Sequence, residues 1–464
     1  MSLITNNSLY ALLQSDSLEN IHQGLAQAKS QKIGIRSWLN DAKLIYKWVY
    51  PEKKPQDTAQ LLLELNTTQT LDLFDKKKAV VPPQLQMLAR LVTLNLSHNR
   101  IRVLPPEIGK LSALQELSVD NNQLAELPEQ IANLTQLRSL SASLNQLVSV
   151  PEQIGNLTRL QELELSCNQL RHLPPQIGEL TELNTLQLIR NQLESLPETI
   201  GKLQNLTLLQ VFENKLTSLP TSIGKLTKLN TLHLFENQLE SLPETIGKLT
   251  GLTKLGLSSN NLEKLPEEIG QLTRLTSLSV WRNRLTELPS TLFSLPLLTE
   301  LSLGYNRIRV LPPEIGKLSA LQKLSVDNNQ LTELPEQIAN LSQLQELDLS
   351  GNPFGDFPWI GKLTQLHSLS ASQSGITQLP LEIGNLTQLT TLTLNLNQLK
   401  RLPPEIGQLT QLENLYLSRN QLSELPPEIS RLQSLKALFL SGNPISPKTK
   451  AQLHTWLPGC KIHI

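Results

Sequence analysis

The sequence predicts an α/β solenoid, a fold in which one supersecondary unit is copied and stacked along the chain. The first observation is an asparagine that recurs every 23 residues, with a single step that departs from this spacing. The second is the stretch LxxLxLxxN, which each of these asparagines closes, and the third is xLxxLPxxIGxL, which follows. The recurring asparagines are Asn99, Asn122, Asn145, Asn168, Asn191, Asn214, Asn237, Asn260, Asn283, Asn306, Asn329, Asn352, Asn397, Asn420 and Asn443.

The first half of each unit predicts a short strand. Leucines alternate with polar residues in LxLxx, which is typical of a strand with one buried face. Successive strands are expected to stack in parallel, roughly 4.8 Å apart. The asparagine amide has two donor hydrogens and an acceptor oxygen, which suit backbone groups where the chain leaves the strand. Its repetition therefore predicts a buried polar ladder.

The second half of each unit predicts a short helical turn. In LPxxIGxL the proline stands near the first position of the turn, where its missing N–H does no harm. Isoleucine and leucine are expected to pack behind the strand, and the glycine between them permits close backbone approach. About seven apolar side chains per unit are then buried. Each contributes roughly 1.5–3 kcal/mol gross, most of which the ordering entropy cancels.

The two ends of the chain lack the period and are expected to form caps. Residues 1–65 are predicted to be a small helical cap, residues 66–446 the solenoid with about 17 units, and residues 447–464 a C-terminal cap. Helical spacing predicts one helix through Leu18, Ile21, Leu25 and Ala28. A second helix is expected before Pro51, from Trp38, Leu44, Ile45, Trp48 and Val49. In the first, degenerate unit Lys76 occupies the asparagine position.

Two departures from the repeat stand out. Residues 99–143 and 306–350 are nearly identical and nine units apart, which indicates a duplicated block and a weak place to seek a distinctive site. The unit that ends at Ser374 has 22 residues and is crowded with aromatic residues, namely Phe354, Phe357 and Trp359. We expect a local kink or packing irregularity there, because aromatic residues near a deletion more often fill a void than bind a ligand.

The pattern LxxLxLxxN-x-L-x-x-LPxxIGxL resembles the leucine-rich repeat family over residues 68–446. It is most similar to the 23-residue repeats of Ras-binding scaffolds, Roco proteins and many bacterial proteins. The resemblance implies a horseshoe with a concave parallel β-sheet, short helical or 3-10 segments on the convex side, and helical caps. It also implies a fold that is generally used to bind protein partners.

The last segment, NPISPKTKAQLHTWLPGCKIHI, resembles the C-terminal cap of bacterial members of this family. In that reading Ser446 is the N-cap of a helix and Pro447 is its first residue. The apolar face that covers the last unit is then formed by Leu453, Trp456 and Leu457.

Composition limits the classes of partner and the compartment. Lys+Arg and Asp+Glu both number 41, so no whole-chain field attracts nucleic acid or an anionic membrane. The cysteines, Cys167 and Cys460, lie too far apart in sequence to form a disulfide framework. No signal peptide is evident and no stretch approaches ~20 apolar residues, so we expect no membrane insertion. A cytoplasmic location is predicted, with non-classical secretion left open.

The motifs that would carry catalysis are missing. Each Gly-Lys of the repeats is followed by leucine, so the phosphate-binding GxxxxGK[S/T] loop is absent. Cys460 is read as a cap residue and not as a nucleophile, because only 18 residues follow position 446. The histidines lack metal-ligand spacing, and Glu162 and Glu164 are read as a solvated strand face. We therefore expect no catalytic residues, no cofactor and no metal.

The positions two before each asparagine should project from the concave sheet, and large apolar residues gather there in the middle of the chain. The adjacent column adds charged residues and a tyrosine. An aromatic cluster rimmed by charges is typical of an interface hot spot. The alternative is that neighbouring rings only stack to stiffen the sheet. The predicted partner-binding residues are Ile189, Arg190, Phe212, Glu213, His233, Phe235, Glu236, Trp281, Arg282 and Tyr305.

Toward the N-terminus the same face leans acidic, which favours a partner with a basic stripe and argues against nucleic acid. The acidic residues are Asp72, Asp75, Glu116, Asp120, Glu162 and Glu164. The sequence thus predicts a non-enzymatic, monomeric scaffold that binds a protein partner on its concave face. Two alternatives stay open, a secreted effector or adhesion factor and a substrate-recruiting subunit of an enzyme complex.

Overall fold

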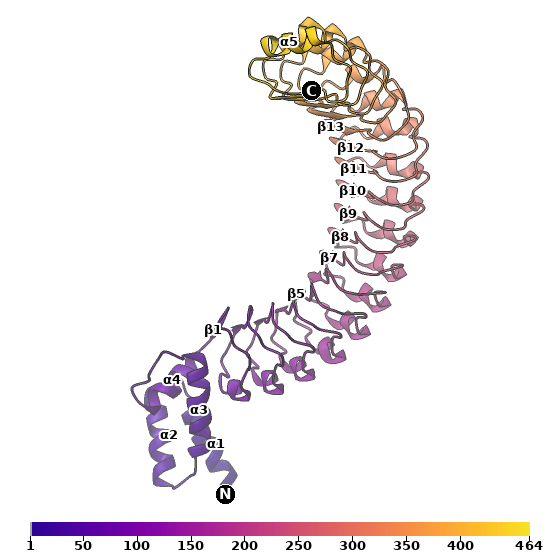
Figure 1. The fold of residues 1–464 in the computed structure, drawn as a ribbon. Coiled ribbons are helices and arrows are strands. Elements are labelled where there is room, and N and C mark those ends of the chain that lie inside the picture. Colours follow the sequence, from indigo (N-terminus) through magenta and orange to yellow (C-terminus); the bar gives the residue numbers. More distant parts are fainter. Residues whose placement is uncertain (1) are drawn as a thin grey trace. The chain divides into compact units, whose positions relative to one another are not determined.

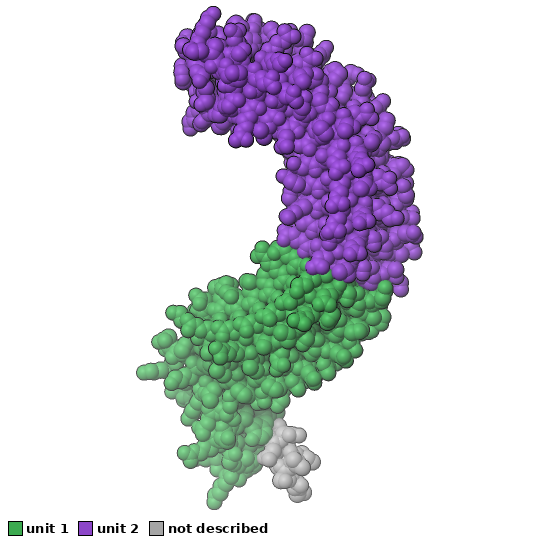
Figure 2. Space-filling view, turned by 45° about the vertical axis from the view of Figure 1, so that its right-hand side comes forward, with its two compact units in different colours: residues 1–215 green, residues 216–464 purple. Residues whose placement is uncertain are grey.

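The structure, a computed structural model, describes residues 2–464, with side chains from residue 8 onward. The chain divides into two compact units, of which unit 1 ends at Lys215 and unit 2 spans Leu216–Ile464. Figure 2 shows unit 1 in green and unit 2 in purple. Within each unit the strands lie side by side along one face and short 3-10 turns lie along the opposite face (Figure 1).

Unit 1 begins with four helices: α1 (Ser2–Leu13), α2 (Leu18–Ser30), α3 (Arg36–Val49) and α4 (Thr58–Thr67). Helices α2 and α3 confirm the two that the spacing of apolar residues predicts. Helices α1 and α4 were not predicted. The start of α4 nevertheless has a sequence signal, because Asp57 accepts a hydrogen bond from the Gln60 amide at 2.8 Å, as an N-cap residue does.

Every repeat contributes one three-residue strand, and the C-terminal cap adds β18. Those of unit 1 are β1 (Thr70–Asp72), β2 (Thr93–Asn95), β3 (Glu116–Ser118), β4 (Ser139–Ser141), β5 (Glu162–Glu164), β6 (Thr185–Gln187) and β7 (Leu208–Gln210). Those of unit 2 are β8 (Thr231–His233), β9 (Lys254–Gly256), β10 (Ser277–Ser279), β11 (Glu300–Ser302), β12 (Lys323–Ser325), β13 (Glu346–Asp348), β14 (Ser368–Ser370), β15 (Thr391–Thr393), β16 (Asn414–Tyr416), β17 (Ala437–Phe439) and β18 (Lys461–His463). Within each unit consecutive strands pair in parallel and in register, so Leu278 lies beside Leu301. The predicted solenoid with a parallel sheet is confirmed.

The segment LPxxIGxL forms a 3-10 turn. In unit 1 these are η1 (Pro83–Met87), η2 (Pro106–Lys110), η3 (Glu129–Asn133), η4 (Glu152–Asn156), η5 (Pro175–Glu179) and η6 (Glu198–Lys202). In unit 2 they are η7 (Thr221–Lys225), η8 (Glu244–Lys248), η9 (Glu267–Gln271), η10 (Ser290–Ser294), η11 (Pro313–Lys317), η12 (Glu336–Asn340), η13 (Ile360–Lys362), η14 (Leu381–Asn385), η15 (Pro404–Gln408) and η16 (Pro427–Arg431). The glycine lets neighbouring turns stack closely, because a Cβ on Gly224 would lie 2.4 Å from the carbonyl oxygen of Thr245.

The core of each repeat holds about seven apolar side chains, as predicted. In the repeat around β8 the buried side chains are Leu232, Leu234, Leu239, Leu242, Ile246, Leu249 and Leu252. Strand leucines and turn residues therefore face each other across a thin interior. Since a single repeat cannot bury these side chains by itself, the fold depends on stacking.

The asparagine ladder connects each repeat to its neighbours. The Asn260 amide nitrogen donates to the carbonyl oxygens of Leu234 and Leu257, both at 3.0 Å, and to that of Ser258 at 3.3 Å. Its amide oxygen accepts the backbone N–H of Leu239 at 2.9 Å. The side chain is only 7% exposed, which confirms the predicted buried polar ladder.

The 22-residue repeat is shortened in its turn. Between Pro358 and Ile360 a single residue stands where other repeats have two, and η13 has three residues where the other turns have five. Phe354, Phe357 and Trp359 are all buried, which confirms that these rings fill space in the core. Ser374, at the ladder position, is fully buried and donates to the Ser372 carbonyl oxygen at 3.0 Å.

The C-terminal end is helix α5 (Pro447–Trp456) followed by β18. Ser446 accepts a hydrogen bond from the Thr449 amide at 3.2 Å, and Pro447 is the first helical residue, as predicted. Strand β18 was not predicted. It pairs in parallel with β17, so that Ile462 lies beside Leu438.

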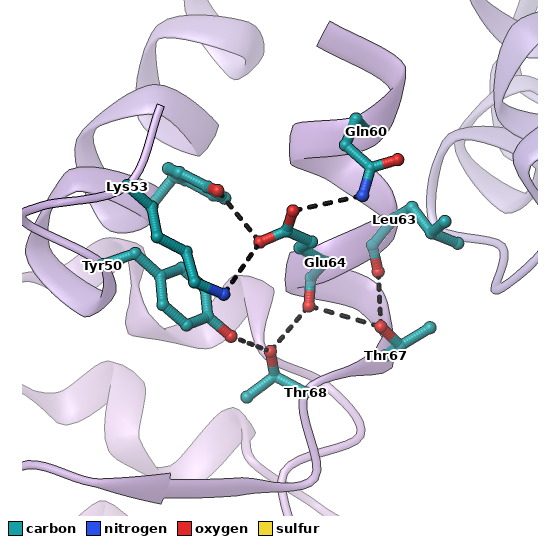
Figure 3. Close-up of polar contacts among 8 residues, drawn as sticks. Tyr50, Lys53, Gln60, Leu63, Glu64, Thr67 and Thr68 are labelled. Atoms are coloured by element: carbon teal, nitrogen blue, oxygen red, sulfur yellow. Dashed lines mark hydrogen bonds and ion pairs between the residues drawn. The ribbon is translucent and has the colours of Figure 1, made fainter. Parts of the chain in front are cut away.

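The N-terminal helices dock on the first repeat. The Trp48 indole donates to the Val80 carbonyl oxygen at 3.1 Å, and the Lys78 ammonium lies 5.0 Å from the Trp48 ring. Within the cap, Glu64 accepts hydrogen bonds from Tyr46 at 2.9 Å and Gln60 at 3.1 Å, close to the Lys53 ammonium (Figure 3).

The same cluster shifts two pKa values. Burial, and then the hydrogen bond to Glu64, raise the pKa of Tyr46 to about 12. Burial by itself would raise the pKa of Glu64, but the bonds from Gln60 and Tyr46 and the Lys53 charge outweigh it, and the pKa of Glu64 is lowered.

Candidate functional site

Three columns of side chains project from the strands on the face opposite to the leucine core, which we call the sheet face. The first and second columns are the outer residues of each strand, such as Lys323 and Ser325, and they flank a buried leucine. The third column lies two residues beyond the strand, as Asp327 does. These columns are the surface that the period-2 alternation predicts.

The residue directly before each ladder asparagine has a left-handed backbone conformation, and we call this set the left-handed column. It includes Arg190 (φ 53°), Glu213 (φ 55°), Glu236 (φ 54°), Arg282 (φ 56°) and Tyr305 (φ 51°). Cys167 (φ 55°) belongs to it as well. The predicted charged rim is therefore built from residues in a conformation that usually favours glycine.

In unit 2, the first pair of candidate rings lies at the end of β8. His233 and Phe235 are half-buried, with ring centroids 5.8 Å apart. A Cβ on Gly256 of the next strand would meet His233 at 3.3 Å and Phe235 at 3.5 Å, so both rings lean over that glycine. Burial, and then the nearby Lys254 ammonium, lower the pKa of His233. Glu236 beside them is exposed.

The second pair follows β10 and β11. Trp281 and Tyr305 form an edge-to-face contact with centroids 5.0 Å apart, a favourable geometry for aromatic rings. Tyr305 is 48% exposed, and Arg282 is exposed next to Trp281. A Cβ on Gly304 would lie 2.9 Å from the Trp281 ring, so this ring also leans toward the following strand.

In unit 1 the candidate residues follow β6 and β7. Ile189 and Phe212 are half-buried in the third column. The Arg190 Nε atom donates to Glu213 at 2.5 Å, so this part of the rim is an internal ion pair. Exposed pairs of this kind contribute little to stability.

In unit 2 the structure thus forms two aromatic pairs, His233 with Phe235 and Trp281 with Tyr305. Phe235 and Trp281 are half-buried, outside the leucine core, and lean the same way along the sheet. That these residues bind a partner stays a prediction.

Sequence reasoning missed an aromatic ladder near the C-terminus. Tyr416 and Phe439 stack with centroids 4.7 Å apart, and Phe439 and His463 stack at 4.4 Å. All three belong to the second column, in which His233 is the only member of the predicted set. The 23-residue spacing of Tyr416 and Phe439 was the available signal, whereas His463 joins the ladder through the cap strand β18.

Sequence reasoning also did not single out two carboxylates on the sheet face of unit 2, Asp327 and Asp348. Asp327 is 8% exposed and accepts hydrogen bonds from the Ser325 hydroxyl at 2.5 Å and the Asn328 amide at 2.8 Å. Burial raises the pKa of Asp348, and the charge of Asp327 raises it further. The sequence did contain one signal. Gly304 lies in the third column of the preceding repeat, and a glycine within a strand region indicates that a neighbouring group packs closely against the backbone.

In the part of the chain that the structure describes, no three His, Cys, Asp or Glu side chains gather as metal ligands would. None of the described helices combines the length and apolar character needed to cross a bilayer. Cys167 and Cys460 are free and half-buried, and burial raises the pKa of the Cys460 thiol. A raised pKa makes that thiol a poorer nucleophile.

Comparison with known families agrees with the geometry. A family model described as a leucine-rich repeat region matches residues 56–171, 163–255, 244–326 and 355–454. A model for two copies of leucine-rich repeats matches residues 319–362. Among curated proteins, no sequence matches the chain.

Solved structures with similar folds come from bacteria and plants. A leucine-rich repeat protein of Leptospira interrogans is 38% identical, with a TM-score of 0.75, over 89% of this chain and 100% of that one. The plant peptide hormone receptor RGFR1, solved in complex with RGF2, is 29% identical with a TM-score of 0.62, over 84% and 74%. An internalin of Listeria monocytogenes is 26% identical with a TM-score of 0.60, over 76% and 94%.

Proposed function

Because the chain belongs to the leucine-rich repeat family, whose fold is generally a protein–protein interaction scaffold, we propose that it binds a protein partner on the sheet face of unit 2. The residues proposed to carry this binding are His233, Phe235, Glu236, Trp281, Arg282 and Tyr305. The single observation that supports the proposal most is the pair formed by Trp281 and Tyr305. Its rings stand on the sheet face beside a glycine, where they offer a large apolar surface for burial.

The proposed mechanism is rigid presentation. The strands that carry the rings are fixed by ladder bonds and backbone pairing, so docking orders few further groups and costs little entropy. The protein acts in this proposal without catalysis or cofactor, as a monomer and in the cytoplasm. The unit 1 residues Ile189, Arg190, Phe212 and Glu213 form a second proposed contact surface.

The proposal is tested by affinity capture with quantitative mass spectrometry. The variant combines Phe235→Ser, Trp281→Ser and Tyr305→Ser, and we expect recovery of the partner to fall by a factor of about ten or more. A matched control combines Tyr416→Ser and Phe439→Ser, which removes aromatic rings from the same face elsewhere. Circular dichroism checks that both variants fold.

Equal recovery by wild type, control and folded triple variant excludes the proposed surface. A separate Phe212→Ser variant tests the unit 1 surface. Unchanged recovery by this variant would remove Phe212 from the contact.

A further inference from the structure

Two residues of the left-handed column are aromatic, His98 in unit 1 and Tyr305 in unit 2. Each contacts an aromatic ring in the third column of the preceding repeat. The His98 ring lies 4.6 Å from that of Phe74, and the Tyr305 ring lies 5.0 Å from that of Trp281. Phe74 is 46% exposed and Tyr305 is 48% exposed, so both pairs offer apolar surface to a partner.

Each aromatic pair is followed by two exposed arginines on the loop that leaves the sheet. In unit 2 these are Arg307 and Arg309, on either side of Ile308, which is fully buried. Because exposure alternates along these three residues, the two guanidinium groups project to the same side of the loop. Unit 1 has the same arrangement with Arg100 and Arg102.

A third cation comes from the preceding repeat. The Arg307 amide donates to the Leu285 carbonyl oxygen at 2.8 Å, so the loop of Arg307 lies directly beside the loop that carries Arg284. In unit 1 the Arg100 amide is bonded in the same way, and Lys77 supplies the third cation.

We call each group an aromatic–basic patch. The patch of unit 1 consists of Phe74, Lys77, His98, Arg100 and Arg102. The patch of unit 2 consists of Trp281, Arg284, Tyr305, Arg307 and Arg309.

The cations of the two patches have no ion-pair partner in the part of the chain that the structure describes. All of them are exposed. Arg309 donates through Nε to the Gln330 amide oxygen at 3.4 Å, and Arg102 donates to that of Gln123 at 3.1 Å, so both acceptors are neutral. Like charges on adjacent layers repel one another, and an anion that binds between them is attracted by all three.

The duplicated block accounts for only part of this recurrence. Copying explains the two arginines of each patch, because they lie within residues 99–143 and 306–350. The aromatic pair and the third cation precede the block, and there the residues differ. Phenylalanine corresponds to tryptophan, histidine to tyrosine and lysine to arginine, so the identities change while the chemical class is kept. This pattern indicates a common role for the two patches.

The charge of the surroundings favours a short acidic segment over a long polyanion. Lys+Arg and Asp+Glu both number 41 in the whole chain, and the sheet face beside the unit 2 patch carries Glu300, Asp327 and Asp348. These carboxylates repel the repeated phosphates of nucleic acid and an anionic membrane surface. A segment with a few carboxylates matches the few cations of a patch, and an aromatic residue beside them packs against the exposed rings.

We propose that each aromatic–basic patch binds a short acidic segment of the protein partner that also carries an aromatic residue, so that one chain has a site in each unit. The guanidinium groups donate paired hydrogen bonds to the carboxylates, and the exposed rings contact the aromatic residue. The inference rests on the proposed function, to which it adds the chemistry of the partner and a site in unit 1.

The test uses the full-length protein and two pools of fluorescein-labelled, capped octapeptides. In the first pool a run of glutamates is preceded or followed by Trp, Tyr or Phe, and the other positions vary among Ala, Ser and Thr. In the second pool glutamine replaces glutamate. By fluorescence anisotropy we expect the glutamate pool to bind about tenfold more tightly. This preference should shrink as NaCl is raised from about 50 to about 300 mM, because exposed charges are screened.

Two double variants locate the effect. Arg307→Gln with Arg309→Gln removes charge from the unit 2 patch, and Arg100→Gln with Arg102→Gln removes it from the unit 1 patch. By equilibrium dialysis at saturating peptide, we expect wild type to hold about two glutamate peptides per chain, each double variant about one and the quadruple variant none. Urea unfolding establishes that each variant is folded.

The matched control is Lys400→Gln with Arg401→Gln. These exposed cations lie on the corresponding loop of a later repeat, where Ser372 and Leu396 occupy the positions of the aromatic pair. The control is expected to leave binding of the glutamate pool unchanged.

Several results would overturn the inference. These are equal binding of both pools, no binding of either, unchanged binding by the quadruple variant, an equal loss in the control, and saturation at one peptide per chain. Tighter binding of a labelled single-stranded oligonucleotide or of phosphatidylserine vesicles, abolished in the quadruple variant, would assign the patches to another class of partner. If the aromatic triple variant loses the captured partner while the folded quadruple variant retains it, the acidic segment is excluded and the docking surface stands.

Discussion

At the scale of the residue, one asparagine per repeat satisfies the backbone where the chain leaves the strand. The residue before it is left-handed, a conformation that costs about 1–2 kcal/mol in a non-glycine residue. The amide of Asn260 bonds four backbone groups of its own and the preceding repeat in compensation. Because these bonds fix the backbone, the left-handed column tolerates arginine, glutamate or tyrosine.

Asp348 should make stability depend on pH. Burial and the neighbouring Asp327 raise the pKa of its carboxyl, so the folded protein keeps a proton that the unfolded chain has lost. The contribution of Asp348 to the free energy of unfolding is therefore fully present below the ordinary aspartate pKa. It is lost as the pH rises from that value through the raised pKa of the folded protein. We expect Asp348→Asn to be at least as stable as wild type at about pH 7 and to lose this advantage near about pH 4.

Urea unfolding of both proteins at the two pH values measures this difference. The difference in the free energy of unfolding between wild type and variant is compared at the two pH values. A difference that grows in favour of the variant on acidification contradicts the assignment.

At the scale of the element, the 3-10 turn of the 22-residue repeat shows how a deletion is absorbed. With one residue fewer before Ile360, the turn shortens to η13, and Phe357 stands where most other repeats have leucine. Phe357 is 1% exposed and packs between Phe354 and Trp359, with ring centroids 5.8 and 6.2 Å away. The larger rings supply volume that the shortened backbone no longer fills.

Phe357→Ala is therefore expected to lower the free energy of unfolding by about 3–5 kcal/mol, since it leaves a cavity among packed rings. Phe357→Leu restores the usual residue of this position and is expected to cost roughly half of that or less. Urea unfolding compares the two. Equal stability of wild type and Phe357→Ala would show that the ring does not fill a void.

At the scale of the whole molecule, stability in a solenoid is close to a sum of local and nearest-neighbour contributions. The helical end of unit 1 is attached through Trp48, which bonds Val80 and lies beside Lys78. Helix α5 covers the other end, in unit 2, with Leu453 fully buried. A substitution that destabilises either cap should therefore lower the stability mainly of the repeats next to that cap.

Trp48→Ala is expected to cost about 2 kcal/mol and to lower amide protection in β1 to β3, while protection in β10 to β13 is unchanged. Hydrogen exchange with mass spectrometry measures both regions in one sample. Trp456→Ala on α5 is the matched control and is expected to loosen β16 to β18 instead. Uniform loss of protection in either variant would show that the repeats unfold as one cooperative block.

The sequence determined the fold class, the strand positions, the ladder and the filling role of Phe354, Phe357 and Trp359. These follow from periodicity, because a pattern repeated at 23 residues can be buried in only one way. It also placed Trp281 and Tyr305 in adjacent columns of the sheet face, and the structure shows that their rings are in contact. It did not determine the left-handed column, since Arg190 or Tyr305 has no backbone preference that marks it.

Only the tertiary structure decided how the surroundings of the two copies of the duplicated block differ. Asp120 and Asp327 have the same adjacent residues. Asp120 accepts hydrogen bonds from Ser118, Ser141 and Ser143. Asp327 accepts them from Ser325 and Asn328, and it packs over Gly304 beside Trp281. The difference arises from the preceding repeats, where Ser97 corresponds to Gly304, and from the following repeat, where Ser141 corresponds to Asp348. In a solenoid the surroundings of a side chain are set by its stacked neighbours, and local pattern by itself does not contain them.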